Sequence, residues 1–229
     1  MAPSVAEGTP NSGATSATTY TWPAHQADDI LLIALESSTS ALSTPSTPSG
    51  MAHSGSSPRS QSTNATSITS FWKRAASNAE SDVIIPAAAN HQIGIPLRIR
   101  GGLVAGNPWD VSTSSGQSSA TGGRTFSGFT TLTADSLVMY MLANDLDSAT
   151  DDFGTLATPS GLTGFTVLDR QATATGDGGQ IIVAYGTKAT AGFVGNLTWT
   201  FGTAAAWSGI AIAFPPALAV TFEGWGVSI

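Results

Sequence analysis

The chain has no cysteine in its 229 residues, which excludes disulfides, thiolate metal sites and catalytic thiols. It is also poor in charge. Asp, Glu, Lys and Arg make up 10% of the residues, against roughly a quarter in an average soluble domain, and only two lysines occur. Because no basic stripe is present to neutralise phosphates, the sequence argues against nucleic acid and against an anionic membrane surface as partners.

Long apolar runs are missing as well. The longest, at 30–35 and 210–216, have the length of strands and are too short to span a bilayer. Residues 1–7 contain neither a basic segment nor an apolar run, so no signal peptide is expected. With 41% hydrophobic residues and abundant Gly, Ser, Thr and Ala, the composition fits one all-β domain with a sizeable core.

What the sequence does contain is a repeat. Five residues after Trp22 the chain reads Ala-Asp-Asp-Ile-Leu-Leu, and five residues after Phe129 it reads Ala-Asp-Ser-Leu-Val-Met, an offset of 107 (129 − 22). Pro48-Ser49-Gly50 likewise recurs as Pro159-Ser160-Gly161. Two units are too few for a solenoid, which needs three or more. The pattern therefore predicts two half-sandwiches, at about 18–105 and 124–216, that close on one core.

Alternating apolar residues predict strands throughout this region, and no segment has a helical period between proper caps. The predicted strands lie at 30–35, 67–75, 82–86, 91–100, 124–131, 134–143, 164–170, 179–187, 196–201 and 206–215. Pro96 favours an edge position for the strand at 91–100, because proline cannot donate to a ladder. Residues 37–66 are predicted to be a long loop that is functional or held by a partner, and 101–123 a connection between the units.

Both ends lie outside the repeat. Residues 1–17 are rich in Ser, Thr, Gly, Ala and Pro, so we expect an N-terminal arm held by a neighbouring subunit, with packing on its own domain as the alternative. Residues 217–229 form a C-terminal arm with strand-like alternation. This arm is expected to close the edge of the sandwich or to add a strand to a neighbouring molecule.

Candidate catalytic residues are few. His25, His53 and His91 are far apart and lack ligand-like partners, so His25 and His91 are interpreted as turn or surface residues and no zinc site is expected. Glu36 and Asp169 are the one carboxylate pair worth considering for a glycosidase. Because no nucleophile elbow or convergent set is visible, we predict no enzymatic activity, no catalytic residue, no cofactor and no metal.

The strongest polar cluster is the acidic loop formed by Asp145, Asp147, Asp151 and Asp152. Its spacing fails the EF-hand pattern, because Ala149 occupies a ligand position and the final glutamate is missing. A solvated acidic loop is the simpler interpretation, and a loop Ca²⁺ site is the alternative.

Tryptophans suggest contact residues. Four of the six, Trp22, Trp72, Trp199 and Trp207, fall within strand patterns and are predicted to be core. Trp109 and Trp225 lie among Gly, Pro and Asn instead. They are therefore candidate interface anchors, and Phe222 in the C-terminal arm is a third.

The same motifs carry a resemblance to a known class of protein. The order Ala-Asp-Asp-Ile-Leu-Leu-Ile-Ala-Leu, Pro-Ser-Gly, Phe-Trp-Lys-Arg-Ala, Arg-Gly-Gly-Leu-Val and Gly-Asn-Pro-Trp-Asp, followed by a second copy, resembles virion structural proteins of tailed phages. The similarity covers about 18–216. It implies a jelly-roll-like β-sandwich on the particle surface, and it carries over no catalytic residue.

The resemblance implies a capsid decoration or cement protein that stabilises the shell through contacts with the major capsid protein, other virion proteins and copies of itself. The alternative is a tail, fibre or spike component that binds a host-surface glycan. A secreted carbohydrate-active enzyme is the third reading, and it would require a carboxylate pair in a cleft.

Overall fold

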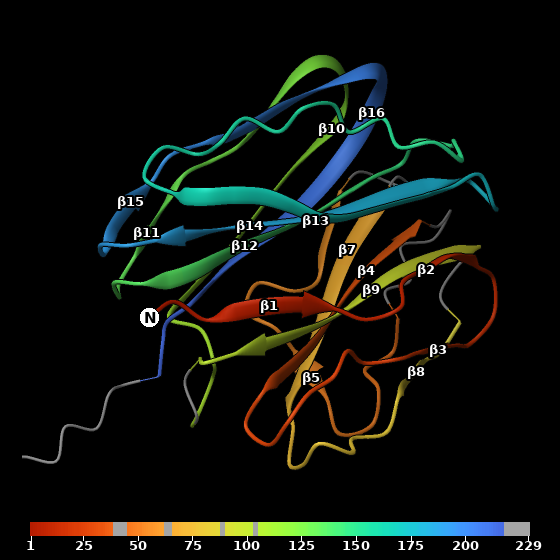
Figure 1. Cartoon of the computed structure of the whole chain (residues 1–229). Helices are drawn as coiled ribbons and strands as arrows, with labels where there is room; N and C mark the ends of the chain where they lie inside the picture. Colours follow the sequence, from red (N-terminus) through yellow and green to blue (C-terminus); the bar gives the residue numbers. More distant parts are fainter. Residues whose placement is uncertain (39–44, 62–65, 88–89, 103–104, 218–229) are drawn as a thin grey trace, which may run out of the picture.

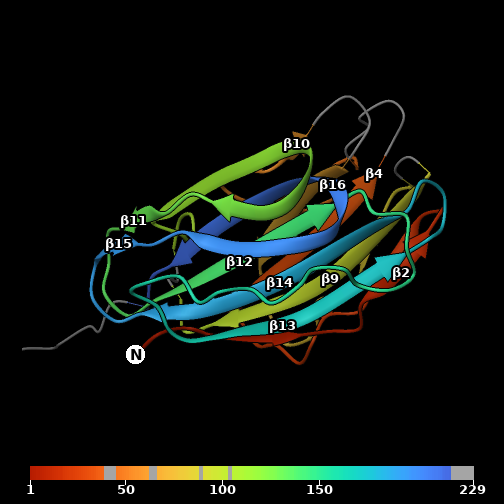
Figure 2. The same cartoon turned by 90° about the horizontal axis from the view of Figure 1, so that it is seen from above.

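The structure, a computed structural model, describes residues 1–38, 45–61, 66–87, 90–102 and 105–217. All helical or extended secondary structure assigned in these ranges is β-strand, and two large antiparallel sheets face each other, as Figures 1 and 2 show. The predicted all-β sandwich is confirmed. In these ranges no helix is long and apolar enough to cross a membrane.

The first sheet takes all its strands from residues 4–100. It has seven strands in the order β1-β9-β4-β7-β5, with β2 also pairing with β9 and β6 with β7. Its members are β1 (Ser4–Glu7), β2 (Asn11–Ala14), β4 (Ile30–Ser38), β5 (Ala52–His53), β6 (Arg59–Gln61), β7 (Thr66–Arg74) and β9 (His91–Arg100).

The second sheet takes its strands from residues 111–214, in the order β10-β16-β12-β14-β13. Its members are β10 (Val111–Phe126), β12 (Ser136–Asn144), β13 (Thr163–Thr173), β14 (Gly179–Lys188) and β16 (Leu197–Phe214). Two short ribbons complete the fold: β3 (Thr18–Tyr20) pairs with β8 (Val83–Ile85), and β11 (Phe129–Thr131) with β15 (Gly192–Val194).

The two sheets share one pairing order. The triplet β9-β4-β7 in the first sheet matches β16-β12-β14 in the second, and the ribbon β3–β8 matches β11–β15. Each set of strands occurs in the same chain order. The duplication of one unit stays a prediction, and its predicted bounds differ from the sheets, since β1 and β2 precede residue 18 and β10 begins before residue 124.

Local turns agree with the repeat. Asp28 and Asp135 both adopt the left-handed conformation, with φ of 69° and 55°, just before β4 and β12. The N–H of Asp28 donates to the carbonyl of Ala75 at 2.9 Å, and that of Asp135 donates to the carbonyl of Ala189 at 3.3 Å. A short polar side chain tolerates this conformation, which is why aspartate occupies it twice.

The two Pro-Ser-Gly motifs are matching turns. Met51 N–H donates to the Pro48 carbonyl at 3.1 Å, and Leu162 N–H donates to the Pro159 carbonyl at 3.2 Å. Gly50 (φ 74°) and Gly161 (φ 83°) hold the third position of each turn. Positive φ at that position is what a type II turn requires, so glycine is needed there.

Buried apolar residues form three layers. One cluster fills the space between the sheets and includes Ile95, Leu97, Met139 and Ile212. Each sheet also covers its outer face: Tyr20 and Trp22 pack over the first sheet, and the segment 146–162 packs over the second. Both faces of the central strands are therefore buried, which explains why β4 and β12 are continuous apolar runs.

The N-terminal segment lies on its own domain, the second of the two alternatives considered. β1 pairs with β9 from Ser4↔Arg100 to Glu7↔Leu97, and β2 continues along the same strand. The expected arm across a subunit interface is therefore not what the structure contains. Without β1 and β2 the far side of β9 would expose unpaired backbone groups. Backbone pairing with this edge orders the N-terminal segment, whose polar composition gives it no core of its own.

Pro96 does not mark an edge strand, contrary to our expectation. β9 lies between β4 and the β1–β2 segment, and Pro96 pairs with Ile33 of β4. Its carbonyl accepts from Gly8 N–H at 2.8 Å, in the gap between β1 and β2. Since N–H and C=O of one residue point to the same side in an antiparallel strand, the missing donor faces this interruption.

Strand boundaries differ from the prediction mainly in the second sheet. The expected connection at 101–123 contains most of β10, and the segments at 196–201 and 206–215 are one strand, β16. β10 consists largely of Ser, Thr and Gly, and its backbone pairing with β16 determines its structure rather than side-chain periodicity. The loop expected at 37–66 contains the short strands β5 and β6.

Candidate functional site

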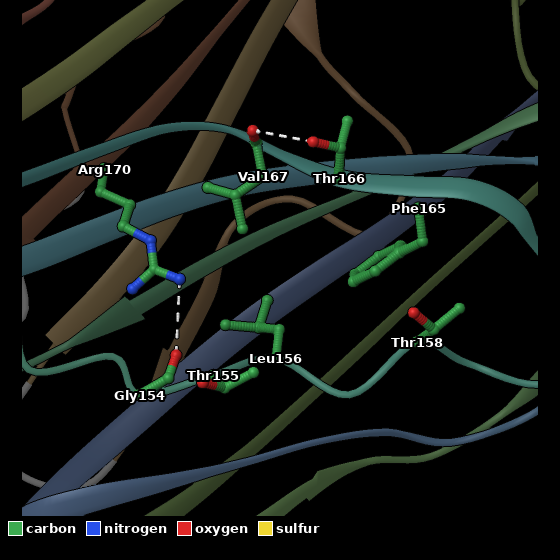
Figure 3. A pocket seen from close by; sticks show the side chains of 8 residues that line it. All are labelled: Gly154, Thr155, Leu156, Thr158, Phe165, Thr166, Val167 and Arg170. Carbon is green, nitrogen blue, oxygen red and sulfur yellow. Dashed lines mark hydrogen bonds between the residues drawn. The ribbon is translucent and has the colours of Figure 1, made fainter.

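A groove of about 460 Å³ lies on the outer side of the second sheet. One wall is the segment 154–158, and the other is the edge strand β13 (Figure 3). We call it the outer groove. Its lining residues are Gly154, Thr155, Leu156, Thr158, Phe165, Thr166, Val167 and Arg170.

Arg170 connects the two walls. Its guanidinium forms an ion pair with Asp151, with 2.6 Å between Nη1 and Oδ2, and it donates to the carbonyls of Phe153 and Gly154. In Figure 3 the side chain extends from β13 toward Gly154. Arg170 therefore positions the segment 151–154, and its charge is balanced by Asp151.

The rest of the outer groove offers hydroxyls and one aromatic ring. Thr166 donates weakly to the Val167 carbonyl at 3.4 Å, while within the described residues no hydrogen bond involves the hydroxyl of Thr155 or Thr158. The Phe165 ring is partly buried and packs edge-on against Tyr140, with 6.2 Å between centroids. A neutral groove of this kind suits an uncharged, hydroxyl-rich ligand better than an ion.

The acidic loop predicted from the sequence is part of the fold. Asp145 Oδ1 accepts from Ala206 N–H at 2.8 Å, and burial raises the pKa of this carboxyl. Asp151 binds Arg170, and Asp152 Oδ2 accepts from Thr203 N–H at 3.2 Å. Asp147 lies against Gly178. Across the described ranges no three His, Cys, Asp or Glu side chains are grouped as metal ligands.

The predicted anchors lie in different environments. Trp109 is partly buried and packs edge-on against Trp72, with 5.3 Å between centroids and 81° between planes. Trp22, Trp199 and Trp207 are buried, as predicted, whereas Trp72 is only partly buried. Trp225 and Phe222 fall outside the described residues, so their role as anchors, like that of Trp109, stays a prediction.

A buried ionisable pair was not predicted. His91 Nε2 lies 2.9 Å from Glu36 Oε2, and both side chains are 0% exposed. His91 is thus not the surface residue expected from its place at a strand start. Glu36 also accepts from Thr66 Oγ1 at 3.1 Å, and His91 Nδ1 lies 3.0 Å from Asn90 Oδ1. Only the register of β4 on β9 brings Glu36 and His91 together.

The Glu36–His91 pair is closed off by the opposite sheet. A Cβ on Gly179 of β14 would lie 2.5 Å from Glu36 Oε2 and 2.6 Å from His91 Nε2, so any larger residue there would force the pair to shift. Burial is the largest effect on Glu36 and raises its pKa, while the hydrogen bond and charge of His91 and the bond from Thr66 lower it. A carboxyl enclosed in this way is not accessible to a substrate.

The other residues considered for catalysis do not converge with this pair. Asp169 lies on β13, where its carboxylate accepts from Gln171 Nε2 at 3.0 Å and from Arg170 N–H at 2.8 Å. His25 lies near the Pro23 carbonyl and accepts from Glu80 N–H, whereas His53 lies against the Phe71 ring. The glycosidase pair of Glu36 and Asp169 thus has no structural support.

A second surface is the outer edge of β10. Within the part of the chain that the structure describes, β16 is the only strand that pairs with β10. In Figure 2 β10 lies at the border of its layer. Every other backbone N–H and C=O of such an edge strand points away from its one neighbour.

Comparison with known proteins gives no match for this chain, whether to family models, to curated proteins or to solved structures.

Proposed function

We propose that this protein is a non-enzymatic structural component of a phage-like particle, a capsid decoration or cement protein that strengthens the shell through subunit contacts. Its place is the particle surface, and its partners are the major capsid protein, other virion proteins and further copies of itself. The sequence resemblance suggests this class of protein. The observation that supports a role in assembly is the uncharged stretch Val111–Gln117 of β10, which among the described strands pairs only with β16.

Two features of the described chain favour this function. Several charged side chains hold the protein together: Arg100 binds Asp29, Lys73 binds Glu80, and Arg170 binds Asp151. The surface that remains for partners includes the Ser- and Thr-rich edge of β10, which no other described strand pairs. Contacts of this kind are individually weak, and symmetric repetition of them stabilises a shell.

The experiment is to image purified particles whose copy of this protein carries a small tag that gold can label. Label spread over the whole head supports a decoration protein. Label at a single vertex or on an appendage contradicts it, and so does the absence of the tagged chain from purified particles. A tagged protein that assembles with untagged copies in a mixed infection controls for damage by the tag.

The outer groove favours a second candidate function, the binding of a host-surface glycan by a tail, fibre or spike component. Its free threonine hydroxyls and the Phe165 ring are groups that sugars use for hydrogen bonding and stacking. A glycan array with the wild-type chain tests it. Binding that is lost in a Thr155→Val/Thr158→Val variant, but kept in Thr130→Val on the exposed ribbon β11, would support this function.

A further inference from the structure

The four edges of the two sheets differ in how open they are to pairing. The first sheet ends in β1 and β2, which are four residues long each, and in β5 and β6, which have two and three residues. Pro58 lies between β5 and β6. Short strands, interruptions and proline are devices that prevent edge-to-edge association.

The second sheet has one protected and one unprotected edge. β13 carries Asp169 and Arg170, and its pairing with β14 contains two register shifts. β10 is 16 residues long and has no ionisable residue and no proline from Val111 to Gly123. Its pairing with β16 is regular from Val111 to Gln117 and shifts only beyond Gln117. Within the described ranges no second strand pairs with this regular, uncharged stretch of seven residues. Ser56 is hydrogen-bonded to Ser112 of this stretch, and Gln61 lies beside its Gly116.

From this contrast we infer that the β10 edge is a self-association surface, where Val111–Gln117 pairs antiparallel with the same segment of a second copy. The inference rests on the proposed function, in which the particle brings copies of this protein together, and it locates one contact between two such copies. The two five-stranded sheets would become one continuous sheet about a twofold axis, with one residue of β10 facing its own equivalent at the centre.

The segment is chemically self-complementary. Val111, Thr113 and Ser115 pair with Ala213, Ala211 and Gly209 of β16, and they face the outer side of the sheet with them. Two antiparallel copies would oppose Thr113 to Ser115 and Ser114 to itself, and hydroxyl side chains exchange hydrogen bonds across strands. Toward the ends Ser112 would face Gly116 and Val111 would face Gln117, so no like charges would meet. A charged partner would find no opposite charge on this stretch, so a second copy fits it better.

The contact is short. Seven paired residues span about 24 Å along one strand edge. The surface area that such a contact buries is well below that of a typical stable dimer interface. We therefore expect a weak, concentration-dependent dimer in solution that becomes populated where a shell holds many copies close together.

The absence of cysteine provides a direct test. In Thr113→Cys, Ser114→Cys and Ser115→Cys, taken one at a time, the residue on the twofold axis would face its equivalent at disulfide distance. One of the three variants should form a covalent dimer under mild oxidation at a rate on the order of tenfold or more above the matched edge control Thr166→Cys on β13. If none of them exceeds this control, the inference is overturned.

A second measurement does not depend on cysteine variants. Sedimentation of the wild-type chain should shift toward a dimer with rising concentration. The variant Thr113→Lys/Ser115→Lys should abolish this shift because it places like charges across the axis, while Thr166→Lys should not. A wild-type chain that stays monomeric at every concentration overturns the inference. If this monomer is nonetheless found over the whole particle head, the proposed function stands and only the β10 contact fails.

Discussion

Replacing His91 by leucine would remove the partner of a fully buried carboxylate. In the wild-type chain Glu36 Oε2 lies 2.9 Å from His91 Nε2, and neither side chain is exposed. In His91→Leu, Glu36 keeps only the hydrogen bond from Thr66 at 3.1 Å. Gly179 packs directly against the pair from the opposite sheet, so the carboxylate is enclosed from that side.

The folded variant can accommodate the loss of His91 in two ways, and their costs set the expected loss in the free energy of unfolding. Keeping Glu36 ionised without a partner costs about 3–5 kcal/mol, the typical loss when one member of a buried pair is removed. Protonating Glu36 at pH 7 costs about 3 kcal/mol, because its ordinary pKa of 4.5 lies two to three units lower and each unit is worth about 1.4 kcal/mol. The cheaper way determines the result, and part of its cost is already present in the wild type, where burial raises the pKa of Glu36. We therefore expect the free energy of unfolding to fall by up to about 3 kcal/mol at pH 7.

The loss should depend on pH in a defined direction. Burial raises the pKa of folded Glu36 above its unfolded value of 4.5, so between the two values the folded state holds a proton that the unfolded state releases. Stability from this group is therefore present below pH 4.5 and is lost as the pH rises through the folded pKa. The leucine variant lacks the His91 contacts that lower this pKa, so its deficit should be small at pH 5 and grow by up to about 1.4 kcal/mol per pH unit.

Urea denaturation followed by tryptophan fluorescence, at pH 5, 6, 7 and 8, measures this deficit. Glu36→Gln/His91→Leu is the matched control, since the neutral amide has no proton to gain and its deficit against the wild type should vary less with pH. At pH 8 the double variant should be more stable than the single one. A deficit of His91→Leu that is equal at all four pH values, or a double variant no more stable than the single one at pH 8, would refute the reasoning.

Three further outcomes are expected. Gly179→Ala should lower the free energy of unfolding by about 1–3 kcal/mol, because its Cβ would lie 2.5 Å from Glu36 Oε2. Gly123→Ala, whose Cβ meets nothing within 4 Å, should change this free energy by less than about 0.5 kcal/mol, and chemical denaturation measures both. Asp29→Asn should cost about 1–3 kcal/mol by the same assay, because the buried Asp29 carboxylate binds Arg100 through both oxygens. Millimolar Ca²⁺ or a chelator should leave the thermal midpoint unchanged within about 1 °C, because the carboxylates of the acidic loop bind separate partners, and a clear upward shift with Ca²⁺ would contradict this.

Several elements of the fold were predictable because their signal is local. The apolar runs at 30–35 and 134–143 predicted β4 and β12, and the alternation at 91–100 predicted β9 with the bounds that the structure has. β10 was missed because Ser, Thr and Gly have no apolar period, and its strand forms through pairing with β16. Whether Pro96 lacks an N–H toward a paired strand or toward a gap depends on the partner strands. The rule that proline marks an edge strand therefore placed the strand at 91–100 wrongly at an edge.

The candidate sites depended even more on tertiary structure. The acidic loop was visible as a cluster of aspartates, but its separate hydrogen bonds to Ala206 and Thr203 were not. Glu36 and His91 are 55 residues apart and meet only through the register of β4 on β9. The outer groove likewise requires the segment 154–158 to lie beside β13, which no spacing along the chain predicts.

The sequence by itself determined the all-β class, the low charge and the lack of thiol chemistry, because these follow from composition and from the period of apolar residues along single strands. Its repeated motifs also determined where equivalent turns occur, since a positive φ at Asp28 and Asp135 or at Gly50 and Gly161 is a property of a few adjacent residues. Only the tertiary structure decided which edges are paired, which carboxylates are buried and which strand stays open. Those properties depend on contacts between residues far apart in the chain, and β10 has its free edge because no described strand lies beyond it.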